Sequence, residues 1–326
     1  MTEAITEPNS RPMTHAAPTR RTVLHAAAAG LSASLGTALG VGLSAAAQPT
    51  PPFKLRYVLA TSLLGTTPLP DLLPLAPQVG DGRLDLWPRP HGNQREQLAE
   101  MGTPRYLELL AAHRVTTAAI SRYDLGALRL TEELPTARAL KAQLLIAAAP
   151  GPKGLHGDEL RAAVRAFAQK LKPHAASAAD AGVTLGIENH SNTLLDTADG
   201  VRWFLEACDA PAVGIALAPY HLPQEPETLA ALVRELGPRL AHFYAWQHGK
   251  GSTGQLTPDE QLLQLPGRGT LDFKPILHAL RAIAYDRLTS VFMHPIPRGI
   301  AIRESPKAVA QELARAREHL EAALAS

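Results

Sequence analysis

The 326-residue chain combines 45% hydrophobic side chains with 32 basic and 30 acidic residues. That is enough apolar material for a full core, and the balanced charge, with no basic run interleaved with aromatic residues, argues against a nucleic-acid partner. The single cysteine, Cys208, excludes an internal disulfide and is expected to pack as a small core residue.

The first fifty residues have the features of an export signal. Arg20 and Arg21 stand in the run TRRTVL, a weakly apolar stretch covers residues 26–47, and small residues at 44–47 suit a signal peptidase. We predict a twin-arginine signal peptide over residues 1–47, a linker over 48–54, and a periplasmic or extracellular location without stable membrane insertion after cleavage. An Ala-rich surface helix or an uncleaved anchor is the alternative.

Apolar runs typical of strands then alternate with amphipathic runs typical of helices. The expected strands are 55–60, 83–87, 117–121, 143–148, 183–188, 213–218, 240–245 and 288–293. The expected helices include 104–113, 159–179, 199–208, 227–236, 273–284 and 306–324. This succession predicts an α/β fold, a single-domain (β/α)8 TIM barrel over residues 55–326. A doubly wound sheet is the alternative, but the first strand lacks a Gly-rich phosphate turn.

In such a barrel the chemistry lies at the carboxyl ends of the strands. The residues that close the predicted strands are rich in His, Glu and Asp. They are Trp87 and His91, Tyr123 and Asp124, residues 188–190, His221, residues 244–248 and residues 294–298. A single histidine at such a position is most often a solvated loop residue, but their shared location indicates a site.

From about residue 171 to 295 the chain resembles the xylose isomerase-like sugar phosphate isomerase/epimerase family. The resemblance is carried by the segments AGVTLGIENH, VGIALAPYHL, LAHFYAWQHG and PGRGTLDFKPIL. It implies a TIM barrel in which two glutamates move a proton between adjacent sugar carbons while a divalent metal polarises the oxygens. It places the first glutamate at Glu188 and a family histidine at His221.

The remaining positions of the family pattern are substituted. The Asp ligand position is Ala218, the His ligand position is Tyr244, and the second glutamate position is Phe292. A methyl group and a phenyl ring cannot bind a hard cation, and a neutral tyrosine binds one poorly. The two-carboxylate proton shuttle therefore cannot operate here as it does in the family.

Alternation along the strands suggests how the site is rebuilt. Residues two apart share a face, which groups Glu188 with His190 and groups residues 242, 244, 246 and 248 with one another. We predict a metal set of Glu188, His221, His248 and His294, which suits zinc or manganese. The alternative, which we favour, is that these histidines and Tyr244 form a polar network that binds a ligand without metal.

Roles follow from chemistry and position. We expect Glu188 to be a catalytic base, with His221 or His294 as acid. Substrate-binding candidates are the aromatic and polar side chains near the same end of the barrel: Trp87, His190, Tyr244, Trp246, Arg268 and Arg298.

These expectations leave three functions open. The first is an isomerase or epimerase that acts on a free carbohydrate by proton transfer next to a carbonyl. The second is a barrel that has lost catalysis and only binds a carbohydrate or a protein partner. The third is a metal-independent lyase or hydrolase, for which Asp85 or Asp124 would have to supply a second carboxylate. The sequence does not indicate an oligomeric state.

Overall fold

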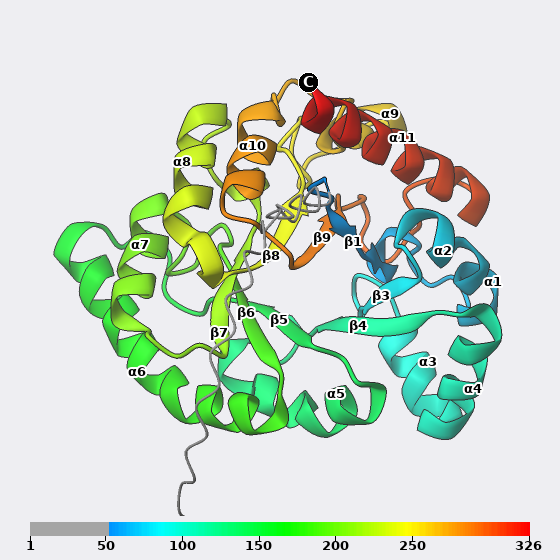
Figure 1. The fold of residues 1–326 in the computed structure, drawn as a ribbon, viewed down its shortest axis with the longest axis horizontal. Helices are drawn as coiled ribbons and strands as arrows, with labels where there is room; N and C mark the ends of the chain where they lie inside the picture. The colour runs from blue at the N-terminus through cyan, green and yellow to red at the C-terminus, as the bar shows by residue number, and fades with distance from the viewer. Residues whose placement is uncertain (1–51) are drawn as a thin grey trace, which may run out of the picture. The chain divides into compact units, whose positions relative to one another are not determined.

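Nine parallel strands form the central sheet, in the order β1-β9-β8-β7-β6-β5-β4-β3-β2 (Figure 1). The computed structural model describes residues 52–326, so the predicted signal peptide and most of the predicted linker lie outside the described residues. The strands are β1 Arg56–Tyr57, β2 Leu59–Ala60, β3 Arg83–Leu86, β4 Thr116–Ser121, β5 Leu144–Ala148, β6 Thr184–Glu188, β7 Val213–Leu217, β8 Leu240–Ala245 and β9 Leu288–Val291.

The first predicted strand is present as two short strands that close the barrel. β1 pairs with β9, the last strand, and β2 pairs with β3. The segment that holds β1 and β2 therefore lies between β9 and β3 and closes the barrel. Val58 lies between the two halves, and its N–H donates to the carbonyl of Thr289 in β9. The predicted (β/α)8 barrel is therefore confirmed.

Helices cover the outside of the barrel (Figure 1). They are α1 Leu69–Leu72, α2 Ala76–Val79, α3 Gln94–Met101, α4 Thr103–His113, α5 Leu134–Leu140, α6 Gly157–Ala181, α7 Ala198–Ala207, α8 Pro226–Leu236, α9 Pro258–Gln261, α10 Lys274–Ala282 and α11 Pro306–Ala325. Each of the six predicted helices named above corresponds to one of these. No helix of the described residues is both long and apolar enough to span a bilayer.

The longest helix, α6, shows how the sequence specifies these elements. Asp158 and Glu159 lie in its first turn, where carboxylates favour the positive end of the helix dipole. It ends before Gly182, whose φ of +67° is the left-handed conformation that glycine adopts without strain. Phe167 of α6 stacks on Phe204 of α7, with ring centroids 5.5 Å apart, which buries the apolar faces of both helices.

The parallel arrangement determines where a site can form. All strands run in one direction, so their carboxyl ends meet at one end of the barrel. The strands that matter most below are β3, β4, β6, β8 and β9, together with the short 3-10 turn Pro219–His221 after β7.

Candidate active site

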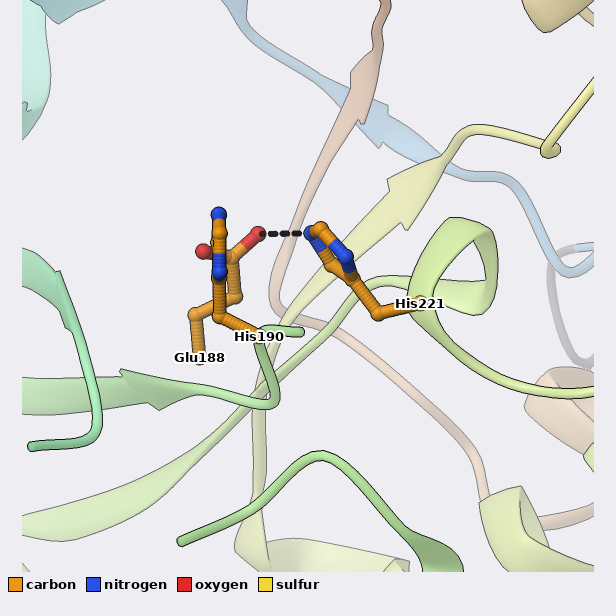
Figure 2. Close-up of side chains that lie close together, drawn as sticks. All are labelled: Glu188, His190 and His221. Carbon is orange, nitrogen blue, oxygen red and sulfur yellow. Dashed lines mark ion pairs between the residues drawn. The ribbon is translucent and has the colours of Figure 1, made fainter. Parts of the chain in front are cut away.

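Glu188, His190 and His221 come together at the carboxyl ends of β6 and β7. Their ligand atoms all lie within 4.8 Å of one another. Oε1 of Glu188 is 3.9 Å from Nε2 of His221, and both side chains are only 3% exposed. Figure 2 shows the His221 ring turned toward the carboxylate, with His190 beside it. This is the convergence on which the predicted site depends.

The side chain of Asn189 holds the ends of β6 and β7 together. Its Oδ1 accepts from the backbone N–H of Ala218 at 2.7 Å, and its Nδ2 donates to the carbonyl of the same residue at 3.1 Å. The amide thus pairs with Ala218 as a backbone peptide would. Asn189 lies between Glu188 and His190, so this pairing fixes where both side chains begin.

The orientation of His221 is set by a serine. Nδ1 of His221 is 2.7 Å from Oγ of Ser191, and this leaves Nε2 facing Glu188 with no hydrogen-bond partner among the described residues. If Ser191 accepts, Nδ1 carries the proton and Nε2 offers a lone pair; if Ser191 donates, Nε2 carries the proton and can donate to a carboxylate. Burial lowers the pKa of His221 to about 2, so the ring is neutral at pH 7. A neutral ring suits a ligand or a hydrogen-bond partner better than an acid.

Glu188 is the buried carboxyl group of this cluster. Burial raises its pKa to about 7, against the opposing influence of His190 and of the hydroxyl of Tyr123. Oε2 of Glu188 has no hydrogen-bond partner among the described residues. The Tyr123 hydroxyl is 3.4 Å from that of Tyr244 on β8, the residue at which the family resemblance implied a histidine ligand. Burial raises the pKa of both phenols, so they stay protonated and can only share or donate protons.

A second buried carboxyl, Asp85, lies on β3. Its Oδ2 accepts from the indole N–H of Trp87 at 2.6 Å, and the hydroxyl of Ser121 donates to it at 3.0 Å. Burial raises the pKa of Asp85 to about 7 although both hydrogen bonds favour the charged form. Asp85 is fully buried and bound by its neighbours, so it supports the floor of the site. Asp124, the other suggested carboxylate, instead pairs with Arg122 at 2.7 Å.

Aromatic side chains fill the centre of this end of the barrel. Trp87, Trp246 and Phe292 are each about 1% exposed, and Phe292 packs against both tryptophans, with ring centroids 5.4 Å from Trp87 and 5.0 Å from Trp246. The expectation that the two tryptophans present an open face to a sugar ring is not supported, because both are buried. Tyr220, which stacks on Trp246 at 3.9 Å, lies above them.

The predicted metal set is only partly brought together. His248 is exposed and stacks on Tyr220 at 5.0 Å, and it does not belong to the Glu188 group found among the described residues. His294 lies across the aromatic centre, where its ring is 4.6 Å from that of His91. His190 takes the third position instead. The alternation that predicted His248 fails because β8 ends at Ala245 and the N–H of Trp246 bonds back to the carbonyl of Tyr244.

The two arginine candidates differ. Arg268 donates to Glu312 of α11 at 2.6 Å, so its guanidinium already has a carboxylate partner. Arg298 is half-buried and lies in the loop after β9, where it donates to the carbonyl of Pro295 and to Oγ of Ser252. Arg298 therefore stays a candidate for contact with a ligand. Nothing supports the substrate-binding role expected of Arg268, because that side chain pairs with Glu312.

Two residues without a role in the predictions from sequence, Asn189 and Ser191, contribute to the site. Both act through their hydrogen bonds rather than by facing a ligand, and their partners lie about thirty residues away along the chain. A pattern of alternation carries no signal for such contacts.

A cavity of about 420 Å³ opens at the opposite end of the strands, lined by Arg83 and Lys141 among others. The chemistry-bearing side chains gather at the carboxyl ends, as barrels of this type require.

Comparisons with known proteins agree with this architecture. A family model described as "Xylose isomerase-like TIM barrel" matches residues 87–319. An IolI protein with a bound zinc atom superposes with a TM-score of 0.64 at 14% identity, covering 82% of this chain and 98% of that one. No curated protein shows a significant sequence match.

Two sugar epimerase structures are similar to a comparable degree. An L-ribulose 3-epimerase has a TM-score of 0.60 at 18% identity, covering 83% of this chain and 95% of that one. A D-psicose 3-epimerase with D-tagatose, from Clostridium cellulolyticum H10, has a TM-score of 0.61 at 16% identity, covering 83% and 99%. At these identities the likeness establishes the fold and leaves the reaction to be argued from the site.

Proposed function

The chain belongs to the xylose isomerase-like TIM barrel family, and we propose from this premise that it moves a proton next to a carbonyl of a free carbohydrate. The observation that carries the proposal is Glu188, buried at the end of β6 with a pKa of about 7 and one carboxylate oxygen unpartnered among the described residues. A base is most effective when its pKa lies near the working pH. The epimerase structures similar in fold act on sugars of this class, as their names state.

In this proposal Glu188 removes the proton from the carbon beside the carbonyl. The phenol of Tyr123, next to the carboxylate, and the N–H form of His221 are the groups able to hydrogen-bond the oxygens of the substrate. The second family glutamate is replaced by the buried Phe292, so Glu188 itself returns the proton. Return by the same group favours reactions in which the proton leaves and re-enters on one face.

The residues present also fit a divalent metal. Two imidazoles and one carboxylate suit zinc, and ligand bonds of about 2.0–2.2 Å place two ligands of one ion roughly 3–4 Å apart. The 3.9 Å between Oε1 of Glu188 and Nε2 of His221 fits this spacing, and that nitrogen has no other partner among the described residues. Glu188, His190 and His221 would hold the ion, which when bound would polarise the carbonyl oxygen of the substrate.

Proton exchange tests the reaction. We expect the purified chain to exchange carbon-bound hydrogen of at least one ketose or aldose with deuterated water, followed by NMR over a panel of free sugars. Glu188→Gln keeps the shape of the side chain and removes the base, and we expect at least about a hundredfold loss. The matched control is His113→Gln on the outside of α4. Full exchange by the Glu188 variant would reject it as the base.

The alternative function is a barrel that only binds its carbohydrate. The substitutions Ala218, Tyr244 and Phe292 favour it because they remove the usual ligands and the second acid. It predicts binding in calorimetry that is unchanged by chelators, with no exchange of any carbon-bound hydrogen.

Zinc titration tests whether Glu188, His190 and His221 bind a metal. A rise in melting temperature that is lost in His190→Ala and His221→Ala would support the three-residue site.

Export is proposed from the sequence of residues 1–47. The prediction is that a tagged full-length chain reaches the periplasm or medium in a host with a twin-arginine pathway. Replacing Arg20 and Arg21 together by lysine should retain it in the cytoplasm, as measured by fractionation. Unchanged export of the double variant would contradict the assignment.

A further inference from the structure

The loop that follows β9 brings an arginine without a carboxylate partner next to two histidines. The half-buried Arg298 donates only to neutral groups, the carbonyl of Pro295 at 2.6 Å and Oγ of Ser252 at 3.0 Å. It forms no ion pair with any described carboxylate, whereas Arg268, Arg303 and Arg315 all pair with Glu312. Removing a guanidinium from water without a counter-ion is costly, and burial lowers the pKa of Arg298.

The neighbouring histidines also have unused hydrogen-bonding atoms. His294 is only 8% exposed, its ring stacks on that of His91 at 4.6 Å, and Nδ1 of each ring has no partner among the described residues. Gln264 fixes the backbone of His294 by bonding both its N–H and its carbonyl. The backbone of His294 is therefore fixed, and its ring packs against Trp87, Trp246 and Phe292.

Backbone packing places Arg298 beside these rings. Gly299 adopts a φ of +83°, and a Cβ there would lie 2.8 Å from the carbonyl oxygen of Pro90, the residue before His91. The loop after β9 and the loop after β3 therefore touch at this point. Burial lowers the pKa of both His91 and His294, and the positive charge of Arg298 lowers both further, as a guanidinium close to the two rings would.

The position of Arg298 is itself supported. Ser252, in the loop after β8, accepts from Arg298 and bonds the hydroxyl of Tyr220 at 2.9 Å. Tyr220 in turn stacks on the buried Trp246. This chain of contacts fixes the guanidinium while leaving its remaining N–H groups without a described partner.

We propose that Arg298, with His91 and His294, forms a subsite for a carboxylate, and that the ligand of this barrel is an acidic carbohydrate such as a uronic or aldonic acid. The planar guanidinium fits a carboxylate with two parallel hydrogen bonds, and the imidazole N–H groups add donors from the side. The proposal rests on the proposed function only in placing the ligand at this end of the barrel; it adds the acidic group that this ligand carries.

Matched ligands test the subsite. Full-length protein is titrated by calorimetry with four hexuronic acids, the four corresponding neutral hexoses and the four hexose 6-phosphates. We expect at least one acid to bind about tenfold or more tightly than its neutral counterpart, at constant ionic strength. If no acid binds better than its neutral counterpart, or if a phosphate binds more tightly than the acid, the proposal is wrong.

Variants assign the preference to the subsite. Arg298→Gln should remove the preference, so that the acid and its neutral counterpart bind with equal affinity, and Arg298→Lys should retain part of it because a charge remains. Arg105→Gln is the control, since Arg105 pairs with Glu108 on the exposed face of α4. Urea denaturation checks that each variant is folded. A preference that survives in folded Arg298→Gln refutes the assignment.

The same experiments separate this inference from the proposed function. Binding is measured in both the native chain and Glu188→Gln, which lacks the proposed base. Loss of the acid preference in Arg298→Gln supports the subsite even if hydrogen exchange is never observed. Exchange that depends on Glu188 but proceeds equally on acid and neutral sugars supports the reaction and overturns the subsite.

Discussion

Replacing Asp85 by asparagine should make the stability of the folded protein less dependent on pH. Asp85 is buried under Trp87, and its folded pKa of about 7 lies well above the ordinary value of 3.8. Between these two values the folded chain holds a proton that the unfolded chain releases, so stability falls as pH rises. The free energy of unfolding falls by about 1.36 kcal/mol per pH unit while the folded carboxyl stays protonated. Between pH 5 and pH 8 this amounts to about 2.5 kcal/mol.

Asparagine is neutral at every pH and keeps both hydrogen bonds. Its carbonyl oxygen can accept from the indole N–H of Trp87, and its amide can donate to Oγ of Ser121. We therefore expect the free energy of unfolding of Asp85→Asn, relative to that of the native chain, to rise by about 2.5 kcal/mol from pH 5 to pH 8.

Urea denaturation followed by circular dichroism, at constant ionic strength and at each pH from 5 to 8, measures this difference. Asp180→Asn, on the exposed end of α6, is the control and should follow the native chain at every pH. If the free energies of unfolding of Asp85→Asn and the native chain run parallel across this range, the carboxyl is not protonated in the folded state and the reasoning is refuted.

Three further predictions concern packing and charge. Phe292→Ala should lower the free energy of unfolding by about 3–5 kcal/mol, measured in urea, because Phe292 is buried among three aromatic rings. Phe292→Glu, which places a carboxylate where the family resemblance implies one, should lower the free energy of unfolding at least as much at pH 8 and less at pH 5, since a buried carboxyl is tolerated when protonated. Glu312→Gln should cost about 1–3 kcal/mol because it breaks the contacts of three arginines, and an unchanged melting curve would show that this network is dispensable.

The fold was predictable because its signal is periodic and local. Alternating apolar strands and amphipathic helices placed the strand limits within about two residues, from 288–293 predicted to Leu288–Val291 observed. The division of the first strand at Val58 was not predictable, since it depends on pairing with β9 at one end and β3 at the other. Such closure is a property of the whole sheet.

The site was predictable at the end of β6 but not after β8. β6 ends at Glu188, and alternation placed His190, two residues later, on the same face; the structure brings both residues together with His221. His248 was assigned by the same alternation, but the turn at Trp246 ends the phase, and the residue is exposed. Trp87 and Trp246 were substrate-binding candidates, yet both are buried and pack against Phe292. Local pattern carries no information on which side chains fill the centre.

The amide of Asn189 gives this site a property that its charged residues alone would not. That side chain adds one more pair of hydrogen bonds between the ends of β6 and β7. The distance between Glu188 and His221 is therefore set in the protein without a ligand. A ligand that bridges the gap loses only its own freedom on binding, since the two strand ends are already ordered. For a ligand that bridges Glu188 and His221, we therefore expect affinity to depend mainly on how well its polar groups match this spacing.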